Sequence, residues 1–152
     1  MSFVSCESGM GLTFLFEEMN RVKVVREKLT FEITETTAVK NLVDASDFIQ
    51  EIKRLGCFFA IDDFGAGMAS YAYLKQLPVD YVKIDGMFVR DLDKNIEGFK
   101  IFESMVKLIH SLNKKVVAEF VATEGLFNIV TKTNVDFVQG YYIAKPIYLS
   151  KI

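Results

Sequence analysis

Short strand-like runs alternate with helical patterns along the whole chain, and this alternation is what most limits the possible fold. The runs are rich in β-branched and aromatic residues, which is typical of buried strands. Five runs are interpreted as strands: 29–34, 57–62, 80–85, 115–119 and 135–139. Apolar residues at helical spacing predict four helices: 12–27, 45–55, 95–112 and 123–131. We therefore predict one α/β domain, with a parallel sheet and crossover helices.

The composition restricts the class of protein. The 152 residues are 51% hydrophobic and 25% charged, as in a globular chain, and the mean hydropathy of +0.23 is high. No apolar run approaches the ~20 residues of a membrane-spanning helix, so we expect the apolar surface to be buried in the fold or against a partner. A net charge of −2 without a basic block argues against a nucleic-acid polymer as ligand. Two cysteines without metal-like spacing and a start without signal-peptide features predict a cytoplasmic location.

Polar residues stand near the end of each predicted strand. Successive side chains of a strand point to opposite faces of the sheet, so each polar residue lies on the other face from its apolar neighbours. Glu32, for example, lies on the opposite face from Phe31 and Ile33. The residues set apart in this way are Glu32, Asp62, Lys83, Glu119 and Gln139. If the apolar face packs on outer helices, all five point inward at the end of a (β/α) barrel that holds catalytic groups. A single strand-end acid is more often simply solvated, but three carboxylates together would repel one another, and a divalent cation such as Mg²⁺ or Mn²⁺ resolves this.

The segment 62–67 places two acids side by side at a strand end. Asp62 and Asp63 can both reach a metal only if the chain turns there, and Gly65 and Gly67 permit such a turn. An Asp-rich turn that caps the following helix explains the local pattern equally well.

Five segments resemble the motifs of one known family in order and spacing. They read E-I-T-E at 32–35, D-D-F-G-A-G at 62–67, K-I-D at 83–85, A-E at 118–119, and Q-G-Y-Y with K-P at 139–146. These segments resemble the EAL family of cyclic di-GMP phosphodiesterases over 29–146. The resemblance implies that 1–152 is part of a (β/α) TIM-type barrel with parallel strands and outer helices. It also implies hydrolysis of cyclic di-GMP, a bacterial second messenger, to linear pGpG with two Mg²⁺ or Mn²⁺ ions.

The resemblance also implies a role for each matched residue. Three residues would be metal ligands: Glu32, Asp62 and Asp63. Lys83 would orient the attacking water and neutralise phosphate charge, and Glu119 would be a ligand or general base. Gln139 would position water or substrate. Glu35 would brace the loop that follows the two aspartates.

Several family features are absent from the sequence. E-A-L, whose Glu binds metal, does not occur, and the Asn ligand of the next strand would fall at or just before Met1 when counted back from Glu32. Ala66 replaces a Thr, Phe120 replaces a Gly, and Ala122 replaces a second Glu of the family pattern. We therefore expect a barrel that lacks its first strands, and impaired metal binding and turnover.

Three functions remain open on the sequence. The chain is part of a phosphodiesterase; or it is a degenerate EAL domain that senses cyclic di-GMP or docks a protein without turnover; or it is an unrelated barrel enzyme with a metal–carboxylate site. Open sheet edges favour a homodimer or a domain-swapped assembly. We expect additional domains in a longer parent protein, and the sequence leaves open whether a diguanylate cyclase is one of them. The only histidine, His110, is expected to pack on a helix rather than to catalyse.

Overall fold

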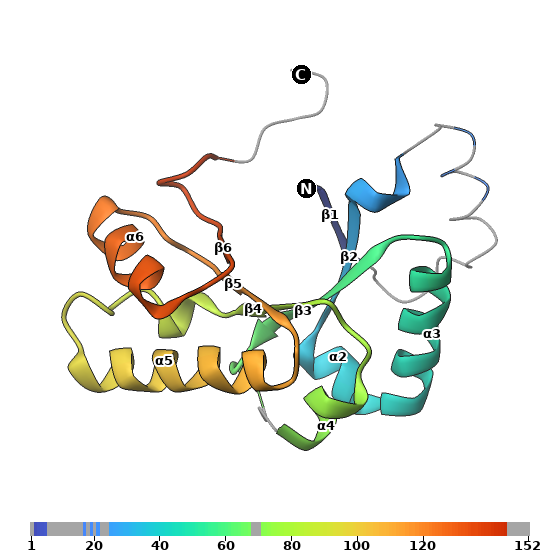
Figure 1. Ribbon diagram of the computed structural model, residues 1–152, viewed down its shortest axis with the longest axis horizontal. Helices are drawn as coiled ribbons and strands as arrows, with labels where there is room; N and C mark the ends of the chain where they lie inside the picture. Colours follow the sequence, from blue (N-terminus) through green and yellow to red (C-terminus); the bar gives the residue numbers. More distant parts are fainter. Residues whose placement is uncertain are drawn as a thin grey trace.

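The strands of the chain form one parallel sheet in sequential order (Figure 1). The computed structural model describes residues 2–5, 17, 19, 21, 25–67 and 71–145. Its strands are β1 (Ser2–Ser5), β2 (Leu29–Thr34), β3 (Phe58–Phe64), β4 (Tyr81–Ile84), β5 (Lys115–Ala118) and β6 (Phe137–Val138). Each strand pairs in parallel with the next one in the sequence. The predicted parallel α/β architecture is therefore confirmed, and within the described residues β1 and β6 form the two edges of the sheet.

Helices connect the strands and flank the sheet (Figure 1). The α-helices are α2 (Glu35–Lys40), α3 (Leu42–Arg54), α4 (Tyr71–Gln76), α5 (Ile96–Ser111) and α6 (Glu124–Val130). Three 3₁₀ turns complete the described elements: η1 (Arg26–Lys28), η2 (Gly86–Phe88) and η3 (Thr131–Thr133). Of the helix predicted over 12–27, residues 17, 19 and 21 are described and are helical, whereas residue 25 is not helical and residues 26–27 belong to the 3₁₀ turn η1; the remaining residues lie outside the described part. No helix of the described part is long and apolar enough to cross a membrane.

The helix ends follow local side-chain chemistry. The side chain of Asn41 accepts a hydrogen bond from the backbone N–H of Asp44 and begins α3, three residues before the predicted start of this helix at 45. The helix stops just before Gly56, as expected, where φ is +85°. Asn95 and Thr123 cap α5 and α6 in the same way as Asn41.

The two faces of the sheet differ sharply in chemistry. The outward face packs on the helices in the main core, which includes Phe31, Phe59, Ile61, Val82, Ile84 and Val116 from the strands. On the inward face, Phe58, Tyr81 and Phe137 form an edge-to-face ladder with 5.7 Å between successive ring centroids. Ala60 and Val117 lie in the same small cluster. The inward face is therefore apolar toward the strand beginnings, and its strand ends carry the polar residues.

Candidate active site

Lys83 lies at the centre of a cluster of acidic side chains. It projects from β4 and is only 3% exposed. Its Nζ lies 3.0 Å from Glu32 Oε2, 2.8 Å from Asp62 Oδ1 and 2.9 Å from Glu119 Oε1. These three acids come from β2, β3 and the residue just after β5, so one ammonium group joins four neighbouring strands at their carboxyl ends. The structure thus brings together four of the five strand-end residues singled out in the sequence.

Asp63 joins this cluster through an unusual backbone conformation. Regular alternation would direct its side chain to the opposite face from that of Asp62. Instead, Asp63 adopts a left-handed φ of +55°, and the pairing of β3 with β4 shifts register between Ile61 and Phe64. Aspartate tolerates this conformation better than most side chains. The chain therefore changes direction at Asp63 itself, ahead of Gly65 and Gly67, where a turn was predicted.

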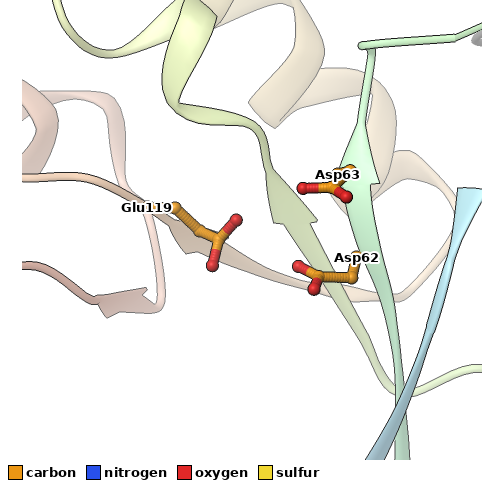
Figure 2. Close-up of side chains that lie close together, drawn as sticks. All are labelled: Asp62, Asp63 and Glu119. Atoms are coloured by element: carbon orange, nitrogen blue, oxygen red, sulfur yellow. The ribbon is translucent and has the colours of Figure 1, made fainter. Parts of the chain in front are cut away.

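The carboxylates of Asp62, Asp63 and Glu119 face one another (Figure 2). Each offers one oxygen atom, and these atoms all lie within 4.8 Å of one another. Hard oxygen ligands at such spacing suit Mg²⁺ or Mn²⁺. Glu32 contacts Lys83 and does not belong to this group of three. The donor set of these acids therefore fits a divalent cation.

The single positive charge of Lys83 does not balance the negative charges of the four acidic side chains around it. Burial alone would lower the pKa of Lys83, but its contacts with Asp62, Glu119 and Glu32 outweigh burial and raise it. Burial raises the pKa of Glu119 to about 7, although Lys83 opposes this shift. Burial and the charge of Asp62 also raise the pKa of Asp63. A bound cation would reverse the shifts of both acids, because it stabilises the ionised carboxylates.

Asp85, for which no role is predicted from the sequence, also lies close to this cluster. After burial and the charge of Asp62, the charge of Asp85 contributes to the raised pKa of Asp63. Asp85 Oδ1 accepts a hydrogen bond of 2.6 Å from the backbone N–H of Met87 and begins η2. Alternation along β4 places Asp85 on the same side as Lys83, so the pattern that singled out Lys83 could also have found it.

Glu35 and Gln139 lie outside the ion-paired group. Glu35, only 1% exposed at the start of α2, accepts a 2.7 Å hydrogen bond from the N–H of Gly65 in the loop after β3. Gln139 is exposed beyond β6, and within the described part of the chain no hydrogen bond or ion pair joins its side chain to the carboxylates. Its backbone donates to Ala118 and accepts from Val121.

Two of the departures from the family pattern flank Glu119 in the structure. Phe120 has a left-handed φ of +55° and is 49% exposed. Ala122 is exposed two residues further along. The third departure, Ala66, donates its N–H to the carbonyl of Asp63 at 3.2 Å and so belongs to the turn that follows the two aspartates.

A parallel sheet with helices on its outer face and with carboxylates and a lysine at the strand ends is the arrangement of the catalytic end of (β/α) barrel proteins. The EAL domain family matches this chain over residues 10–146, and the chain belongs to that family. The expected membership is therefore confirmed.

Curated relatives resemble the chain over most of its length. It is 42% identical over 116 residues to the cyclic di-GMP phosphodiesterase PdeB of Shewanella oneidensis, which covers 76% of the chain and 14% of PdeB. It is 42% identical over 119 residues to the cyclic di-GMP phosphodiesterase PdeF of Escherichia coli, covering 78% of the chain and 16% of PdeF. The chain therefore spans less than a fifth of the length of these two relatives.

Solved EAL domains share the fold. The phosphodiesterase PaMucR in complex with c-di-GMP has a TM-score of 0.89 at 28% identity, over 98% of this chain and 62% of that one. The FimX EAL domain of Pseudomonas aeruginosa bound to c-di-GMP has a TM-score of 0.87 at 30% identity, over 95% of this chain and 61% of that one. These neighbours are TIM-type barrels, and this chain corresponds to part of such a barrel.

Proposed function

We propose that this chain carries the lysine and carboxylate portion of a site that hydrolyses cyclic di-GMP to pGpG. The observation that carries the proposal is the convergence of Glu32, Asp62 and Glu119 on Lys83, with Asp63 beside them. Structural elements without a function seldom bury so many ionisable groups together, because each must be desolvated. The names of the relatives, which are cyclic di-GMP phosphodiesterases, support the same substrate.

Each residue of the cluster receives a role in phosphodiester hydrolysis. Asp62, Asp63 and Glu119 would hold Mg²⁺ or Mn²⁺, and Glu32 is assigned as a further ligand from the adjacent strand. Such ions, when bound, polarise the phosphodiester and acidify the attacking water. Lys83 holds the carboxylates in place and neutralises negative charge on the phosphate.

Proton transfer is assigned to Glu119. Its carboxylate lies beside those of Asp62 and Asp63, within reach of a water held among these acids. Water adds to phosphorus, the bond from phosphorus to the 3′ oxygen breaks, and the proton ends on that oxygen. Gln139 is assigned to positioning water or substrate, and Glu35 to holding the loop after β3 through Gly65.

Turnover is proposed to be impaired in this chain alone. The E-A-L sequence does not occur in it, and Ala122 stands where the family has a second Glu. The alternative function is a non-catalytic sensor of cyclic di-GMP or a protein-interaction module, and the substitutions at Phe120 and Ala122 favour it. A cytoplasmic location also remains a proposal, as does self-association through the open edges at β1 and β6.

Calorimetric titration of cyclic di-GMP into the chain, with Mn²⁺ present and chromatography of the mixture afterwards, tests the proposal. The phosphodiesterase assignment predicts that the wild type binds cyclic di-GMP and produces pGpG. Glu119→Gln should abolish pGpG formation. The control Glu103→Gln, on the exposed side of α5, should leave the amount of pGpG unchanged. Binding without product would identify a sensor. Absence of binding would contradict both assignments for this chain.

A further inference from the structure

Phe120 combines two unfavourable features immediately after Glu119. Its φ of +55° belongs to the left-handed region, which glycine adopts without strain and a phenylalanine does not. The residue is also 49% exposed, which is a large exposed fraction for an apolar residue. Neither feature stabilises the fold. Such outliers beside a polar site point to a role in binding rather than in folding.

The ring of Phe120 lies directly over Gly86, the buried first residue of η2. A Cβ atom added to Gly86 would lie 2.8 Å from the Cβ of Phe120 and nearer still to its ring carbons. Only glycine at position 86 therefore leaves room for the ring. Gly86 follows Asp85, whose charge contributes to the raised pKa of Asp63 after burial and the charge of Asp62. The ring is thus held at the same end of the sheet as the acidic cluster.

The guanidinium group of Arg90 lies beside the ring of Phe120. Its carbon atom lies 4.6 Å from the ring centroid, which is a cation–π distance. Arg90 is exposed, and the ring retains an open surface. An aromatic surface next to a cation matches two chemical features of a nucleotide, the flat base and the anionic phosphate.

We propose that Phe120, supported by Arg90 and Gly86, forms a stacking subsite for one purine base of the cyclic dinucleotide. This inference rests on the proposed function and names a specificity-determining contact for the same site. A base stacked on Phe120 lies beside Glu119, so the subsite would hold the dinucleotide next to the reacting groups. The strain at Phe120 is then the cost of presenting an aromatic ring where glycine would fit more easily.

The test compares binding with stability in variants of the chain. Cyclic di-GMP is titrated calorimetrically with Ca²⁺ present, Mn²⁺ is titrated alone, and urea unfolding gives the midpoint. Phe120→Gly is expected to weaken dinucleotide binding about 10-fold, the loss of one stacked base. Its urea midpoint should stay equal or rise because the backbone strain is relieved. Phe120→Tyr, which keeps the ring, should retain the affinity within about 2-fold.

Met87→Ala is the matched control, because Met87 is 61% exposed in the same turn as Gly86. Its dinucleotide affinity should equal that of the wild type, and Mn²⁺ affinity should be unchanged in every variant. If Phe120→Gly binds cyclic di-GMP as tightly as the wild type, or if Met87→Ala weakens binding equally, the stacking subsite is wrong while the proposed function stands. If the wild-type chain binds Mn²⁺ but no cyclic di-GMP, both proposals fail.

Discussion

Lys83 Nζ lies 2.9 Å from Glu119 Oε1, and the two side chains are only 4% and 7% exposed. This buried ion pair connects β4 to the end of β5. Ions removed from water in this way lose most of their hydration, so each depends on its partner for stabilisation. Because Lys83 also pairs with Glu32 and Asp62, the whole cluster depends on one ammonium group.

Lys83→Met should strongly destabilise the chain near neutral pH. The substitution leaves buried carboxylates without their counter-ion, and breaking a buried pair in this way costs about 3–5 kcal/mol. Urea unfolding monitored by circular dichroism measures the loss. The matched control is Lys107→Met, since Lys107 pairs with Glu103 at 2.9 Å while its own side chain is 70% exposed. The control should cost less than about 1 kcal/mol, and equal losses in the two variants would contradict this account of Lys83.

Gly140→Ala should disturb the connection after β6. An added Cβ would lie 2.7 Å from the carbonyl carbon of Val121 and nearer still to its oxygen and nitrogen atoms. The backbone of Val121 cannot move away from the added Cβ without breaking its hydrogen bonds with Gln139 and Tyr142. We expect a loss of more than about 1 kcal/mol in the free energy of unfolding.

Gly125→Ala provides the control for this substitution. Gly125 lies in α6, where the nearest atom to an added Cβ is 3.8 Å away. Alanine in a helix is favoured over glycine by about 0.5–1 kcal/mol, so this variant should be more stable than the wild type. Destabilisation of both variants to the same extent would indicate that the contact with Val121 is not the cause.

Asp136 should make stability depend on pH in the acid range. Burial favours its neutral form, but hydrogen bonds from the Val116 N–H and from His110, each 2.8 Å long, outweigh burial and lower the pKa of Asp136. A carboxyl group with a depressed pKa stabilises the fold above its unfolded pKa of about 3.9. This contribution is lost as the pH falls through the lower pKa of the folded state.

Asp136→Asn should therefore flatten the fall in stability below about pH 4. Urea midpoints between neutral pH and the acid limit measure this slope. Asp93→Asn, at an exposed position in the loop before α5, is the control and should keep the slope of the wild type. An unchanged slope in Asp136→Asn would show that the contacts with Val116 and His110 do not stabilise the carboxylate.

Alternation along the strands predicted much of the site. It separates Glu32, Asp62, Lys83 and Glu119 from their apolar neighbours, and the structure brings all four into contact. This worked because each strand packs one face on helices, and a period of two then determines the direction of every side chain. The same rule fails at Asp63, where a register shift and a left-handed φ interrupt the period.

Other elements were missed because their signals are short or depend on distant contacts. α2 and α4 have six residues each, fewer than two helical turns, and β1 has four residues. Helical periodicity needs a longer window. The ladder of Phe58, Tyr81 and Phe137 joins residues far apart in the sequence, so no local pattern reports it.

Titration of Mn²⁺ into the chain by calorimetry tests the central claim most directly, because the claim is that these strand-end carboxylates form a divalent cation site. We predict saturable binding to the wild type and at least about 10-fold weaker binding to Asp63→Asn, which removes one negative charge from the group of three acids. Glu103→Gln, which alters an acid on α5 outside this group, should bind as the wild type does. Failure of the wild type to bind Mn²⁺, or equal affinities for all three chains, would contradict the claim.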